Sequence, residues 1–143
     1  MVAKVILRFL LIALLALSTL FLSACGVKLD ESAIEPFMEQ LYKARKTGSF
    51  YKEFTLYAKD DFKIVPFEEV ENTLRLVVGG SGRFKKARHI HTKISRRNQL
   101  GEGLISYVVA TYEVTYSNTT LTESYFFLAS EEKPKLVYMT LQF

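Results

Sequence analysis

Cys25 is the residue whose chemistry the sequence defines best. It is the only cysteine among the 143 residues, so neither an internal disulfide nor a cysteine zinc cluster can form. A thiol with neither role can still act as a nucleophile for covalent modification. Ser23 and Ala24 precede it, and their small side chains would let a peptidase reach the backbone. We therefore expect Cys25 to be modified and to become the first residue of the mature chain.

The segment before Cys25 has the organisation of an export signal. Lys4 and Arg8 are followed by an uncharged apolar run of 14 residues, from Phe9 to Leu22. As a helix this run would rise about 21 Å, short of the roughly 30 Å hydrocarbon core of a bilayer. A cleaved leader over residues 1–24 is therefore expected in preference to a permanent span. Removing it leaves 17 basic and 15 acidic residues, a net charge of +2.

The four residues Leu22-Ser23-Ala24-Cys25 resemble the lipobox of bacterial lipoproteins at every position. The resemblance implies cleavage between Ala24 and Cys25, a lipid carrying palmitate-type chains on Cys25, and attachment to a membrane. Gly26 resembles the residue found in lipoproteins sent to the outer membrane of Gram-negative cells, where the domain would face the periplasm. The alternative is an ordinary signal peptide or an uncleaved anchor.

The two histidines are spaced as strand neighbours on one face. If His89 and His91 lie two residues apart on a regular strand, both imidazoles could bind a metal. Glu113 or Glu123 would have to supply a third ligand, and Lys93 on the same face would repel a cation. We therefore expect no metal or other cofactor, and a solvated or partly buried strand face at both histidines.

A basic segment, residues 83–97, is the strongest charge feature of the mature chain. It holds seven basic residues and no acidic one: Arg83, Lys85, Lys86, Arg88, Lys93, Arg96 and Arg97. In an exported protein such a segment would meet lipid phosphates, glycolipids or an acidic protein, and we expect no nucleic-acid partner. The alternative interpretation is an edge strand whose charges prevent pairing between sheets.

Three helices are expected after a short tether over residues 25–31. The first begins at Ser32, with capping-box spacing to Glu35, an apolar face at helical spacing and Gly48 at its end. A shorter helix follows Ser49, with a break at residues 59–61. A third begins near Pro66 and ends in the glycine-rich residues 79–82.

Beyond Gly82 the periodicity changes from helical to alternating, which predicts four antiparallel strands. Residues 108, 110, 112, 114 and 116 should share one face of the second strand. Turns are expected at residues 117–119 and 131–135, and the sequon that starts at Asn118 is interpreted as part of the first turn. Residues 32–143 therefore predict one α+β domain, with three N-terminal helices on one face of a curved four-stranded sheet.

The element order and the strands 107–116 and 122–127 resemble small exported proteins of the NTF2-like, cystatin-related group. Enzymes of that superfamily use a carboxylate or histidine with a hydrogen-bond donor inside the cavity between sheet and helices. The resemblance implies that such a cavity could be lined by Tyr42, Tyr57, Tyr112 and Tyr125.

Aromatic residues at these spacings are more often part of a core, and no acid/base pair is evident in the sequence. We therefore expect a non-enzymatic envelope lipoprotein that binds a protein or a small ligand. An isomerase- or dehydratase-like cavity enzyme, and recognition of anionic lipid or glycolipid by residues 83–97, are the alternatives. The sequence does not indicate an oligomeric state.

Overall fold

A computed structural model describes residues 26–143, so the predicted leader and Cys25 lie outside the described part of the chain. Two long helices, α2 (Ile34–Lys46) and α4 (Phe67–Gly80), and one short helix, α3 (Phe50–Phe54), precede four strands. The strands are β1 (Phe84–Gln99), β2 (Gly103–Tyr116), β3 (Thr120–Leu128) and β4 (Leu136–Gln142). They form one antiparallel sheet in the order β1-β2-β3-β4. The predicted α+β class and the four antiparallel strands are confirmed.

The start of the first helix differs from the prediction. The Asp30 side chain accepts a hydrogen bond from the backbone N–H of Ser32, which opens a 3-10 turn over Glu31–Ala33. The long helix α2 begins after that turn and has no side-chain cap at Ala33. The expected Ser32–Glu35 capping box therefore does not form, because the Ser32 N–H group that Glu35 would have bound already donates to Asp30.

The other helix ends follow the local sequence. The Ser49 side chain caps α3, and α4 starts directly after Pro66. Helix α4 leads into β1 through Gly82, whose φ of +88° lies in the left-handed region. A Cβ atom at Gly82 would lie 2.0 Å from the Ser117 hydroxyl oxygen, so glycine is required where this turn meets the β2–β3 turn.

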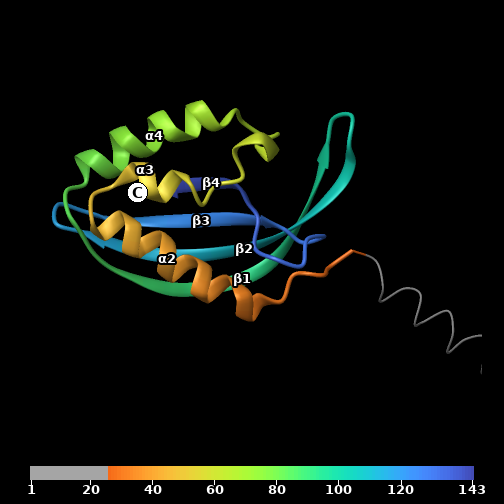
Figure 1. Cartoon of the computed structure of the whole chain (residues 1–143), viewed down its shortest axis with the longest axis horizontal. Helices are drawn as coiled ribbons and strands as arrows, with labels where there is room; N and C mark the ends of the chain where they lie inside the picture. Colours follow the sequence, from red (N-terminus) through yellow and green to blue (C-terminus); the bar gives the residue numbers. More distant parts are fainter. Residues whose placement is uncertain (1–25) are drawn as a thin grey trace, which may run out of the picture.

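The helices cover one face of the sheet (Figure 1). The main core combines Met38 and Leu41 of α2 with Leu74 of α4 and the predicted inward face of β2. That face consists of Val108, Ala110, Tyr112, Val114 and Tyr116, as the alternation indicated. A smaller apolar cluster lies on the opposite face and consists of Tyr107, Val109, Phe126 and Val137. Within residues 26–143, no helix is both long and apolar enough to cross a bilayer.

The segment expected as a tether is attached to the domain. The backbone N–H groups of Lys28 and Leu29 donate to the carbonyl of Ala129 at 2.7 and 3.2 Å. The Leu29 side chain is buried in the main core. Contact with the domain therefore begins at Lys28, three residues after Cys25.

Candidate functional site

A groove of about 750 Å³ lies between α2 and the edge strand β1. Its apolar lining comes from Ile34, Met38, Tyr42, Phe84, Ala87 and Tyr112. Polar and charged groups line the rest: Glu31, Ser32, Glu35, Glu39, Lys43, Lys46, Lys86, His89 and Thr92. A concave apolar surface with a few polar groups is the usual form of a ligand site.

Aromatic contacts fix the floor of the groove. The Tyr42 ring of α2 stacks on Phe84 of β1, with centroids 5.4 Å apart and an interplanar angle of 15°. It meets Tyr112 of β2 edge-on at 5.6 Å. Burial is the main cause that raises the pKa of the Tyr42 hydroxyl well above its usual value. The floor is therefore an uncharged aromatic surface whose position depends on helix and sheet together.

Charge along the groove is divided between its two ends. Glu31 of the 3-10 turn and Glu35 and Glu39 of the first half of α2 line one part of the groove, and Glu35 adds to the burial effect that raises the pKa of Tyr112. Lys43 and Lys46 of the second half of α2 line the other part, and Lys46 also lines a neighbouring hollow with Arg83 and Phe84. An occupant would thus meet carboxylates near the start of α2 and ammonium groups near its end.

The histidines do not share a face. A β-bulge between them shifts the register, so that His89 lies opposite Tyr112 and His91 lies opposite Thr111. Directly paired residues point to the same side of a sheet, and Tyr112 and Thr111 point to opposite sides. His89 therefore faces the groove, with its Nε2 atom 2.8 Å from the Thr92 hydroxyl. The alternation that predicted a shared face is interrupted by one extra residue.

The two glutamates considered as a third metal ligand have other partners. Glu113 lies opposite Arg88 and pairs with its guanidinium at 3.2 Å, while Glu123 is buried in the core. In the described chain from Gly26 onward, no group of three residues of metal-binding type is arranged to hold an ion. Neither the histidines nor these carboxylates therefore form a metal site in the described part of the chain.

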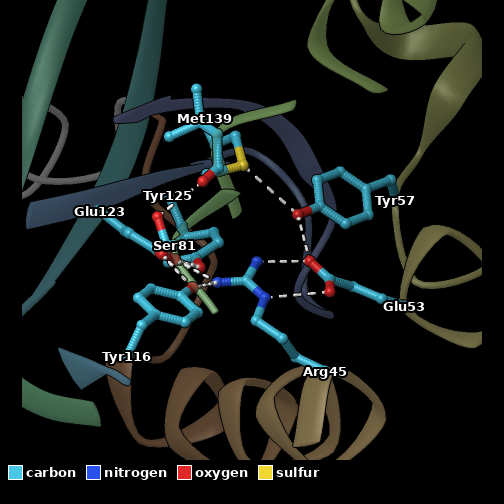
Figure 2. Close-up of polar contacts among 9 residues, drawn as sticks. Arg45, Glu53, Tyr57, Ser81, Tyr116, Glu123, Tyr125 and Met139 are labelled. Atoms are coloured by element: carbon cyan, nitrogen blue, oxygen red, sulfur yellow. Dashed lines mark hydrogen bonds and ion pairs between the residues drawn. The ribbon is translucent and has the colours of Figure 1, made fainter. Parts of the chain in front are cut away.

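A buried polar network joins α2, α3 and the sheet (Figure 2). Arg45 of α2 forms ion pairs with Glu53 of α3 and Glu123 of β3, and both glutamates are 0% exposed. Its Nε–H group donates to Glu53 at 3.0 Å, and one Nη1–H donates to the Tyr116 hydroxyl at 2.8 Å. The guanidinium is thus shared between two carboxylates from different elements.

Three tyrosine hydroxyls complete the hydrogen bonds of these carboxylates. Tyr116 donates to Glu123 at 2.7 Å, Tyr125 donates to the same carboxylate, and Tyr57 donates to Glu53 at 3.1 Å. Burial is the main cause that raises the pKa of all three hydroxyls, so they stay protonated donors at neutral pH. The network combines carboxylates with donors, but its carboxylates are closed to solvent.

The four tyrosines expected around one cavity are divided between two places. Tyr42 and Tyr112 line the groove, whereas Tyr57 and Tyr125 are bonded into the buried network. Arg45 and Tyr116 of the network also line the neighbouring hollow, which has a volume of about 350 Å³. The groove of about 750 Å³ lies beside the sheet edge.

The basic segment 83–97 is distributed along β1 and the turn before it. Arg83 lines the neighbouring hollow, and Arg88 pairs with Glu113 on the far face of the sheet. Lys86 borders the groove but lies opposite Thr115, so its side chain points to the same far face as Arg88. The Arg97 guanidinium lies 5.0 Å above the Phe126 ring. Arg96 is exposed near the end of the strand. Four of the seven share the face of the sheet away from the helices, because they lie opposite β2 residues of that face: Lys86, Arg88, Lys93 and Arg97. Arg96 lies opposite Ser106 and points to the other face.

Sequence reasoning did not single out Arg45 or Glu53. A signal for Arg45 was present, since it lies four residues after Leu41 on the apolar face of α2. A charged residue on such a face needs a buried partner of opposite charge. Nothing in the local pattern identified Glu53 as that partner.

Comparison with known proteins adds no further information: no family model, no curated protein and no solved structure matches this chain.

Proposed function

We propose that this chain is a bacterial envelope lipoprotein whose NTF2-like, cystatin-like domain binds an extended segment of another envelope protein without catalysing a reaction. Lipidation at Cys25 would hold the domain on the membrane. In a Gram-negative cell, the favoured location is the outer membrane, with the domain facing the periplasm. Support for the anchor comes from the charged n-region, the 14-residue apolar run and the lipobox-like residues 22–25. Attachment of the domain from Lys28 onward would keep it close to the bilayer.

The observation that carries the binding proposal is the groove between α2 and β1. Strand β1 is at the edge of the sheet, and no strand of the described domain pairs with its outer side. An extended peptide could add to that edge through its backbone, while its alternate side chains pack on the apolar floor. A hollow of about 750 Å³ is large enough for several such side chains.

Charge favours a particular kind of peptide. A second copy of β1 would bring two strongly basic strands together, which costs free energy because like charges repel. A segment with acidic residues would instead meet Lys43 and Lys46. We therefore favour a partner segment that is acidic where it passes the end of α2.

The hydrogen bonds and burial of the core carboxylates support a role in binding without catalysis. Glu53 and Glu123 are each bound by Arg45 and by tyrosine hydroxyls, and neither reaches solvent. A general base must instead lie within hydrogen-bond reach of its substrate. His89 is the titratable ring in the groove, and it is hydrogen-bonded to Thr92.

Site-specific photo-crosslinking in cells tests the groove. A benzophenone amino acid at Lys43, an exposed position of α2 that lines the groove, should form an adduct that mass spectrometry maps to one extended segment of an envelope protein. The same probe at Tyr51, which is 80% exposed on α3, is the control position. Replacing Ala87 in the floor by phenylalanine should lower the yield at position 43 by about tenfold, equivalent to about 1.4 kcal/mol of binding.

Three outcomes would contradict the binding proposal. Equal yields at positions 43 and 51 would mean that the groove has no preference for a partner. Adducts that survive Ala87→Phe in a chain with unchanged thermal stability would place the partner elsewhere. An adduct with the mass of a small molecule would replace the peptide by a small ligand.

A further inference from the structure

The β1–β2 hairpin projects beyond the rest of the sheet (Figure 1). Strand β1 ends at Gln99 and β2 begins at Gly103, so the tip is formed by residues 100–102. Leu100 at this tip is fully exposed, with a relative accessibility of 104%, and Leu104 is 67% exposed. Exposing two large apolar side chains to water at a projecting end is unfavourable, and their transfer to an apolar environment would lower the free energy.

Two basic residues lie on the strand that leads to this apolar tip, Arg96 about 13 Å and Lys93 about 23 Å along β1 from Leu100. Lys93 and Arg96 are exposed on the adjoining part of β1 and form no ion pair with an acidic residue of the described domain. Glu102 is the single acidic residue between Lys93 and Leu104. Exposed leucine next to unpaired basic residues matches the interface of an anionic bilayer, where acyl chains lie beneath phosphate groups.

The described chain begins at the same end of the molecule as the hairpin (Figure 1). The N–H group of Lys28 donates to Ala129, whose own N–H donates to the carbonyl of Ser106 at 3.0 Å. Ser106 lies opposite Arg96 in the β1–β2 pair. The start of the domain is therefore connected to the base of the hairpin. Three residues from Cys25 to Lys28 span at most about 11 Å.

We infer that the hairpin tip enters the interface of the same anionic bilayer that holds the lipid anchor, an inference that rests on the proposed lipidation of Cys25. Leu100 and Leu104 would lie at the boundary of the acyl chains, and Arg96 would bind lipid phosphates. Lys93, farther from the tip, would add to the electrostatic attraction. An anchor at one point leaves a domain free to rotate, whereas two contacts fix its orientation. The hairpin would thus determine which side of the domain faces away from the membrane.

An environment-sensitive fluorophore tests this contact in the full chain, purified with its anchor and placed in vesicles containing phosphatidylglycerol. Leu100→Cys provides the attachment site, and a lipidated Cys25 has no free thiol to react. Leu76→Cys is the matched control, because Leu76 is a 76% exposed leucine on α4. We expect shorter-wavelength emission and quenching by spin-labelled lipid at position 100 and neither at position 76.

Charge dependence provides a second readout. Replacing Lys93 and Arg96 by serine should lower the equilibrium constant for insertion of the label by about fivefold for each charge. Raising the salt concentration to 1 M should act in the same direction, because it shortens the screening length to about 3 Å. Neither change should alter the control label at position 76.

Different outcomes would refute the hairpin contact and the lipid anchor. A label at position 100 that is as exposed to water as the label at position 76 would overturn the hairpin contact. Burial of that label only when another protein is added would also overturn it, in favour of a protein interface. A parent chain that takes up the fluorophore at Cys25 would refute the anchor and, with it, this inference.

Discussion

At the scale of single residues, Arg45 determines how the core of this domain is held together. Its guanidinium faces two carboxylates that have no access to water, and one of them comes from the neighbouring helix and the other from the sheet. Buried ion pairs are costly to desolvate, so their net contribution to stability is small when all partners are present. Losing one partner has a much larger effect, because a buried charge is left without compensation.

Replacing Arg45 by methionine should therefore lower the free energy of unfolding by about 3 to 5 kcal/mol. Arg88→Met is the matched control, since Arg88 also pairs with a glutamate but is 66% exposed. Its loss should cost less than about 1 kcal/mol. Urea unfolding followed by circular dichroism measures both variants. If both variants lost similar amounts of unfolding free energy, burial would not make the Arg45 ion pairs more important for stability than the exposed pair of Arg88.

At the scale of elements, tyrosine hydroxyls link strands and helices through the same carboxylates. Tyr57 follows α3, Tyr116 ends β2, and Tyr125 lies in β3. Burial raises the pKa of each hydroxyl, so the folded state retains these protons where the unfolded chain releases them. Their contribution is complete below the unfolded tyrosine pKa of about 10 and is lost as the pH rises above it.

The free energy of unfolding should accordingly fall as the pH is raised from about 8 to about 11. Tyr116→Phe should reduce the slope of that fall, because one proton fewer is then linked to unfolding. Tyr51→Phe should leave the slope unchanged, since Tyr51 is exposed on α3. Urea midpoints at each pH provide the measurement. If the two variants gave identical slopes, the buried hydroxyls would not be the source of the alkaline instability.

Strand β1 shows why local spacing can mislead at this scale. The i, i+2 spacing placed His89 and His91 on one face, yet the bulge between them directs the rings to opposite sides. A bulge depends on how a strand meets its neighbour, and the histidine spacing itself contains no sign of it. Strand β1 is an edge strand of the sheet. Its basic residues are therefore compatible with the alternative interpretation, in which their charges prevent pairing between sheets.

At the scale of the whole molecule, the proposed anchor and the fold determine how close the domain lies to a membrane. Lys28 is bonded to Ala129, so little free chain would separate a lipid on Cys25 from the folded core. A domain attached this closely can touch the bilayer with its neighbouring hairpin. The groove between α2 and β1 would still be open to a partner.

Cys25→Ser should abolish incorporation of an alkyne-labelled fatty acid and leave the leader attached. The hydroxyl is a weaker nucleophile than the thiol, and lipoprotein processing requires the lipidated sulfur. Intact-mass measurement of the membrane fraction distinguishes the 119-residue mature chain from the full 143 residues. Val27→Ser, next to the cleavage region, should behave as the parent chain. Continued fatty-acid labelling of Cys25→Ser would refute the lipidation proposal.

The sequence by itself determined the features that depend on residues near one another in the chain. Apolar periodicity predicted the helices, the four strands and the inward face of β2, because secondary structure repeats over a few residues. The leader and Cys25 are also defined by local pattern, and their processing stays a prediction. In each of these cases the physical cause lies within a short segment.

Only the tertiary structure decided which distant residues meet. Arg45, Glu53 and Glu123 are far apart in the chain, and their ion pairs exist because α2 and α3 pack on one face of the sheet. The groove likewise requires α2 to lie beside β1, and the opposite directions of His89 and His91 require the bulged pairing with β2. Burial and pairing between elements set these features, since neither is a property of a single segment.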